Sequence, residues 1–140
     1  MLAFYCLLLK NNPCFLGRLL ESVYFCSKSV LERMTHSQVL DRIKHIAMEI
    51  LPKGSSLYLY GSRARGDFHE ESDWDLLVLL NKPNREKDDW DNYAFPFTNM
   101  GWDIGEDISA RCFTRDEWQN SPHTMFYYNV EEDKHLLYES

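Results

Sequence analysis

Asp73 and Asp75 stand two positions apart at the start of the apolar run 76–80. Side chains two apart on a strand point to the same face, so we expect the two carboxylates to project together and Trp74 to turn the other way. Carboxylates, with water and substrate phosphates, are the ligands that Mg²⁺ prefers. The pair therefore predicts a magnesium site at the beginning of a strand.

Gly61 and Ser62 offer a complementary group. They follow the short apolar run 57–60, which is typical of a buried strand that ends in a glycine turn. A strand that breaks at glycine and continues as a helix leaves backbone N–H groups free to bind a phosphate. Phosphate-binding backbone beside metal-binding carboxylates predicts a metal-assisted nucleotide site.

Arg63 and Arg65 come directly after this turn. Guanidinium groups suit phosphate oxygens, so either arginine could bind a triphosphate. We expect Arg63 to lie nearer the nucleotide and Arg65 to be structural. The alternative is that one of them pairs with Asp67, Glu70 or Glu71 and holds the loop.

The combined pattern is Gly61-Ser62, ten intervening residues, and Asp73-x-Asp75. It resembles the signature of the polymerase-β-like nucleotidyltransferases, above all their minimal (MNT-type) group, which includes antitoxins paired with HEPN toxins. The fuller run Gly-Ser-Arg-Ala-Arg-Gly-Asp, followed by Ser-Asp-x-Asp-Leu, strengthens the resemblance, which covers residues 34–140 and is strongest over 57–80.

This resemblance implies an α/β (α+β) fold, with a small mixed β-sheet flanked by helices. It implies an enzyme that uses Mg²⁺ and a nucleoside triphosphate, with ATP the expected donor, and that transfers AMP to a hydroxyl group. In the antitoxin group that hydroxyl belongs to a tyrosine of a HEPN-type toxin. Ser62 and the backbone beyond Gly61 would hold the terminal phosphates.

A third carboxylate is expected from the alternating segment 106–113. Its apolar positions (Ile108, Ala110, Cys112) fall on one face and its polar positions (Asp107, Ser109, Arg111) on the other. In the resembling family, an acid on such a strand helps to bind the metal or activates the attacking hydroxyl. Asp107 is the best match, with Glu106 and Asp103 as alternatives, because a one-residue slip would exchange the faces.

The remaining elements are read from hydrophobic periodicity. A helix is predicted over 37–50, strands near 56–60 and 135–138, and short helices from 114 and from 122. Trp90, Tyr93, Ala94 and Phe97 recur at helical spacing, so we expect one helical face packed on the sheet. Pro96 would interrupt that helix and Gly101 would end it.

Composition restricts the class of protein. A chain of 140 residues with 44% hydrophobic residues is long enough for one globular domain with a core. The net charge of −7 argues against a long nucleic-acid ligand, which normally requires a basic surface. The apolar run 2–9 is too short to span a membrane and lacks the basic residues of a secretory signal.

Residues 1–33 differ in character from residues 34–140. Three of the four cysteines (Cys6, Cys14, Cys26) fall in the first segment, with spacings that match no zinc or redox motif. We interpret residues 1–33 as an extension, with the working domain beginning at Met34; an interaction arm is the alternative. Cysteines without a disulfide framework favour a cytoplasmic protein.

Two other functions fit the same residues. A non-catalytic module could use the pocket to hold a nucleotide or to neutralise a toxin by contact. A transferase of the aminoglycoside-modifying type could act on a small molecule, for which a dimer would have to replace the missing second domain.

Overall fold

The computed structural model describes residues 33–120 and 122–140, and Met34–Ser140 form one compact unit. The hypothesis about residues 1–33 concerns positions that, except for Arg33, lie outside the described residues, as do Cys6, Cys14 and Cys26.

Four strands form one mixed sheet in the order β3-β2-β1-β4. The strands are β1 (Ser56–Tyr60), β2 (Trp74–Leu80), β3 (Ile108–Thr114) and β4 (His135–Glu139). β1 pairs antiparallel with both β2 and β4, whereas β2 and β3 run parallel. Parallel neighbours start at the same edge of a sheet, so β2 and β3 bring their first residues together.

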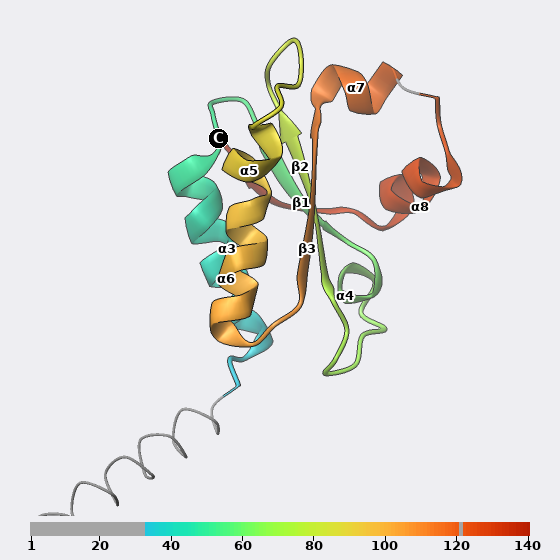
Figure 1. Cartoon of the computed structure of the whole chain (residues 1–140). Coiled ribbons are helices and arrows are strands. Elements are labelled where there is room, and N and C mark those ends of the chain that lie inside the picture. Colours follow the sequence, from blue (N-terminus) through green and yellow to red (C-terminus); the bar gives the residue numbers. More distant parts are fainter. Residues whose placement is uncertain (1–32, 121) are drawn as a thin grey trace, which may run out of the picture. The chain divides into compact units, whose positions relative to one another are not determined.

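Helices cover both faces of this sheet (Figure 1). One face carries α3 (His36–Ile50), α5 (Asp89–Tyr93) and α6 (Phe95–Ile104). On the other side lie α7 (Arg115–Asn120), α8 (Met125–Asp133) and the single-turn α4 (Ser62–Arg65), which follows β1 directly. The predicted small mixed sheet flanked by helices is confirmed.

The helix predicted over 37–50 is α3, which begins at His36 after a capping box. The Thr35 hydroxyl accepts a hydrogen bond from the Gln38 backbone N–H at 3.3 Å, and the Gln38 side chain accepts one from the Thr35 N–H at 2.8 Å. Each of these bonds satisfies an N–H group that lacks a partner within the helix. α3 then buries Val39, Ile43 and Ala47 on one face.

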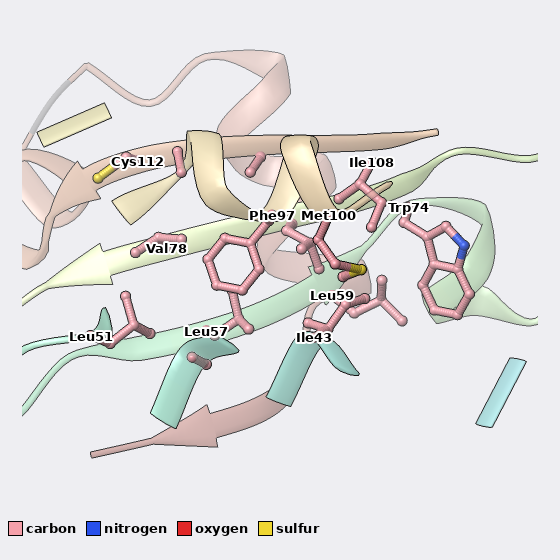
Figure 2. Close-up of a cluster of buried hydrophobic side chains, with 14 of the residues drawn as sticks. Ile43, Leu51, Leu57, Leu59, Trp74, Val78, Phe97, Met100, Ile108 and Cys112 are labelled. Atoms are coloured by element: carbon pink, nitrogen blue, oxygen red, sulfur yellow. The ribbon is translucent and has the colours of Figure 1, made fainter. Parts of the chain in front are cut away.

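The main core lies between the sheet and the layer of α3 and α6 (Figure 2). Trp74 and Phe97 are its largest fully buried side chains. A second, smaller cluster fills the opposite face, where Trp118 of α7 and Val130 of α8 pack on the sheet. Within the described residues, no helix is long and apolar enough to cross a membrane.

The segment 89–104 differs from the prediction. Ala94 and Phe97 are buried as expected, but Trp90 is 48% exposed. The reason is a break at Ala94: α5 ends there, and Pro96 occupies the first turn of a new helix, where its missing N–H costs nothing. The break rotates Trp90 to the surface. Gly101 does not end α6, which continues to Ile104 and stops at Gly105.

The core assignment predicts a contrast between two residues of α3. Ile43 is 0% exposed and Met48 is 64% exposed. Ile43→Ala leaves a cavity and should lower the free energy of unfolding by about 2–5 kcal/mol, whereas Met48→Ala should change it by less than about 0.5 kcal/mol. Urea denaturation of the full chain measures both; equal effects would contradict this description of the core.

Candidate functional site

The three predicted carboxylates lie on one side of the β2–β3 pair. The parallel register sets Trp74 beside Ile108 and Asp75 beside Ser109, and the Trp74 N–H donates to the Asp107 carbonyl at 2.8 Å. Trp74 and Ile108 are buried in the main core. Because strand side chains alternate, Asp75 and its flanking neighbours on the polar side, Asp73 and Asp107, face away from that core.

The Gly61 turn lies directly against Asp75. Tyr60, the last residue of β1, pairs with Asp75, and Gly61 has a φ of +74°, a conformation that only glycine adopts readily. A Cβ atom at position 61 would lie 2.6 Å from the Asp75 Oδ2 atom. Glycine is therefore required here both by the backbone and by the space that the carboxylate occupies.

The electrostatic surroundings of Asp75 disfavour its charged form. Partial burial is the largest cause of a raised pKa for this carboxyl group, and the nearby Asp73 and Asp107 carboxylates raise the pKa further. Arg111 and Arg65 act in the opposite direction but do not reverse the shift. Mutual repulsion between carboxylates at one place is relieved by a bound cation.

The donor set has the chemistry that a divalent cation requires, since all three groups offer hard oxygen ligands. In residues 33–120 and 122–140, however, no three His, Cys, Asp or Glu side chains converge as a ready-made metal-binding group. The carboxylates thus fit Mg²⁺ in type and in shared face, while a ligand set of Asp73, Asp75 and Asp107 stays a prediction.

Arg63 is held in place by several contacts of its own. Its side chain is buried; Nε donates to the Ser72 carbonyl at 2.8 Å, and Nη2 lies 3.5 Å from the Glu106 Oε2 atom. The guanidinium carbon lies 4.2 Å from the centre of the Trp74 ring. Arg63 thereby connects the turn after β1 to the residues before β2, while its predicted contact with the nucleotide stays a prediction.

Glu106, the alternative third acid, belongs to this same buried group. Its Oε2 atom accepts a hydrogen bond from the Trp74 indole at 3.0 Å as well as facing Arg63. Trp74 points away from Asp75, so Glu106 is directed away from the two first carboxylates. Of the two acids, Asp107 is the one that influences Asp75.

His36 also joins the group around Trp74, which the sequence did not indicate. Its ring lies 5.0 Å from that of Phe68 and 4.6 Å from that of Trp74. The Nε2 atom is buried without a hydrogen-bond partner. Burial, followed by the neighbouring Arg63 charge, lowers the pKa of His36, which favours a neutral ring.

Arg65 is structural, in agreement with its predicted role. Its Nε atom lies 3.3 Å from the Asp67 Oδ2 atom and its Nη1 atom 2.5 Å from the Asp133 Oδ2 atom. Asp67 therefore braces the loop, and Asp133 connects α4 to the end of α8.

Two further residues line the site and had no predicted role. Arg111 of β3 and Tyr60 of β1 both reach toward Asp75: burial and then the Asp75 charge raise the pKa of Tyr60, and Arg111 opposes that rise. Strand alternation had placed Arg111 on the face of Asp107. It gave no indication that this long side chain extends back across β2 toward the carboxylate.

Comparison with known proteins agrees with this geometry. Residues 40–132 match the nucleotidyltransferase domain family. The bifunctional uridylyltransferase/uridylyl-removing enzyme of Pseudomonas entomophila (strain L48) is 35% identical over 66 residues, which are 47% of this chain and 7% of that protein. The chain belongs to the nucleotidyltransferase domain family.

Solved structures show the same fold. A toxin–antitoxin structure with AMP-PNP is 20% identical, covers 72% of this chain and 73% of its own, and has a TM-score of 0.52. A mutant of the MntA–HpeT toxin–antitoxin, with two aspartates two positions apart changed to glutamate, is 17% identical with the same coverage and a TM-score of 0.50.

The contact between Gly61 and Asp75 predicts a difference between two glycines. Gly61 and Gly66 both have positive φ, but a Cβ atom at Gly66 would meet nothing within 4 Å. Alanine should cost about 1–2 kcal/mol of backbone strain at Gly66, which is left-handed helical, and about 1–3 kcal/mol at Gly61, whose ψ of −156° lies in a region that is essentially limited to glycine. Only Gly61→Ala should also displace the Asp75 carboxylate and abolish nucleotidyl transfer. Urea denaturation and a transfer assay separate the effects; an active Gly61→Ala variant would contradict the proposed contact.

The raised pKa of Asp75 predicts a pH-dependent stability. The folded chain retains the Asp75 proton over a pH range in which the unfolded chain has lost it, so stability falls as pH rises through that range. At pH 7 without metal, Asp75→Asn should therefore be more stable than the unchanged protein, and the gain should shrink as pH falls toward the usual range of an aspartate.

Thermal unfolding in EDTA between pH 4.5 and 7 measures this effect. Asp41→Asn, an exposed change on α3, serves as the control and should leave the stability nearly constant. A less stable Asp75→Asn variant at pH 7 would show that the charged carboxylate has a compensating partner.

Proposed function

We propose that this member of the nucleotidyltransferase domain family is an active, Mg²⁺-dependent enzyme that transfers AMP from ATP to a hydroxyl group of a partner protein. The observation that carries the proposal is the Gly61 turn, which leaves space for the Asp75 carboxylate beside Asp73 and, on the parallel strand, Asp107. This arrangement combines an anion-binding turn with hard oxygen ligands at one edge of the sheet.

In this proposal Asp73 and Asp75 hold the metal and Asp107 either completes its ligand set or takes the proton from the attacking hydroxyl. Mg²⁺, when bound, supplies charge neutralisation for the nucleotide phosphates. The hydroxyl oxygen bonds to the α-phosphorus, the bond from that phosphorus to the bridging oxygen breaks, and pyrophosphate leaves with the electron pair.

Gly61 and Ser62 are proposed to grip the phosphates through backbone N–H groups and the Ser62 hydroxyl. α4 has no side-chain cap, so its first N–H groups are not used by a side chain of the described residues. Arg63 follows Ser62 and is proposed to lie beside the bound nucleotide. Its bond to the Ser72 carbonyl fixes the turn against the start of β2.

Two structures of similar fold support the choice of donor and acceptor. One toxin–antitoxin was crystallised with AMP-PNP, an ATP analogue, and in the other the aspartate pair was changed to glutamate. We infer that the acceptor is a tyrosine of a HEPN-type toxin and that the two proteins form a pair in the cytoplasm. The uridylyltransferase relative makes UTP the competing donor.

Loss of either metal carboxylate should abolish transfer without unfolding the protein. Full-length chain is incubated with Mg²⁺, a lysate of its source cells, and ATP or UTP labelled at the α-phosphate. We expect a labelled protein band with ATP that disappears with Asp73→Ala, with Asp75→Ala and with EDTA. The exposed Asp41→Ala variant is the matched control and should label as well as the unchanged chain.

The other outcomes distinguish the remaining functions. Label on a small molecule would indicate an antibiotic-modifying type of transferase. Tight ATP binding without any label would indicate a contact-only antitoxin. Labelling that persists in the Asp73→Ala/Asp75→Ala double variant would refute the metal role of the pair.

A further inference from the structure

Three arginines surround the candidate site, and two of them are committed to structural contacts. Arg63 is buried against Trp74 and bonded to the Ser72 carbonyl. Arg65 is paired with two carboxylates, one in its own loop and one at the end of α8. Arg111 is different, because its side chain is exposed on the polar face of β3.

The position of Arg111 is fixed by three neighbours. In the strand register it lies beside Leu77, two residues along the sheet from the level of Asp75. Its guanidinium carbon lies 4.9 Å from the centre of the Phe126 ring of α8. Asp75 and Arg111 lie on the same face of the β2–β3 pair, and the Arg111 charge opposes the rise in the pKa of both Asp75 and Tyr60. Arg111 therefore leans back over β2 toward the carboxylates.

No ion pair within 4.0 Å involves Arg111 in the part of the chain that the structure describes. The carboxylate whose pKa it lowers is Asp75, which is assigned above to the metal. A guanidinium group that packs on an aromatic ring beside a hydroxyl, and that forms no ion pair, keeps its N–H donors available for a planar or tetrahedral oxyanion.

The opposite sides of Asp75 are occupied by complementary groups. The Gly61 turn lies on the β1 side of the carboxylate, and Arg111 comes from β3 on the other side. A triphosphate placed near three aspartates meets strong repulsion unless cations offset it. The proposed metal neutralises part of this charge, and Arg111 is the exposed cation next to the remainder.

We propose that Arg111 binds the pyrophosphate portion of the donor nucleotide and stabilises it as it leaves. This inference rests on the proposed function and deepens it, because it assigns recognition of the triphosphate to a residue outside the Gly-Ser and Asp-x-Asp motif. In this proposal Arg111 contacts the two phosphates that leave as pyrophosphate and does not contact the base or the sugar.

Phe126 positions this arginine. Its ring supports the guanidinium group from α8, whose Asp133 also holds Arg65. Packing of α8 on the sheet thus sets the location of the charge that faces the phosphates, in addition to completing the smaller core.

Binding of three ligands tests the proposal directly. Isothermal titration of the full chain with ATP, pyrophosphate and AMP, each with Mg²⁺, compares ligands with and without the leaving group. Arg111→Ala should weaken ATP and pyrophosphate binding by about tenfold or more, the usual effect of losing a charged hydrogen bond. AMP binding should be unchanged, and Arg111→Lys should keep part of the ATP affinity because it keeps the charge.

Arg85→Ala is the matched control. Arg85 is also a half-exposed arginine over an aromatic ring, 5.5 Å from the centre of Phe113, but no contact of Arg85 reaches a candidate site residue. It should leave the ATP affinity unchanged. Circular dichroism checks that Arg111→Ala is folded; if it is not, Arg111→Lys and the ratio of ATP to AMP affinity decide the matter.

Each remaining outcome has a separate meaning. Equal losses for ATP and AMP, or no loss at all, would overturn the role of Arg111 while leaving the nucleotide site in place. An unchanged chain that binds ATP but transfers nothing would overturn the proposed reaction and not the phosphate contact. Failure of the unchanged chain to bind either ATP or pyrophosphate would overturn both.

Discussion

The site depends on the close approach between the Gly61 turn and the Asp75 carboxylate. Any side chain at position 61 would begin within 2.6 Å of that carboxylate, and the positive φ there already favours glycine. The antiparallel pairing of Tyr60 with Asp75 imposes this contact, since it brings the end of β1 to the start of β2. The turn that we propose to bind phosphate and the strand that we propose to bind metal are therefore neighbours in the sheet.

The layer behind the site fixes this contact in place. Arg63, Trp74 and Glu106 form a buried polar and aromatic group in which the guanidinium, the indole and the carboxylate each satisfy another member. A buried charge that lost its partner here would carry a large desolvation cost. These buried contacts hold the loop between α4 and β2 in its conformation. The exposed side of the turn and the carboxylates are not needed for this purpose.

The sequence predicted much of this architecture because the relevant signals are local. The Gly-Ser turn and the alternation in β3 each act over a few residues, and the buried Cys112 followed from alternation alone. The features that the sequence did not indicate depend on tertiary packing. Arg63 turned inward because Trp74 and Glu106 lie beneath it, and Trp90 became exposed because α5 ends at Ala94. No periodicity in the sequence encodes either outcome.

Asp73 and Asp75 differ in mechanical freedom. Asp75 lies within the hydrogen-bonded ladder of β2, paired on both sides, whereas Asp73 precedes the strand and is exposed. A cation bound between them would have one ligand whose position the sheet fixes and one ligand that can move to suit the radius of the cation. Such a site would accommodate ions of different size through movement of Asp73 alone. Substitution of one divalent metal for another would therefore change the geometry on the Asp73 side and leave the Asp75 side, which the sheet fixes, unchanged.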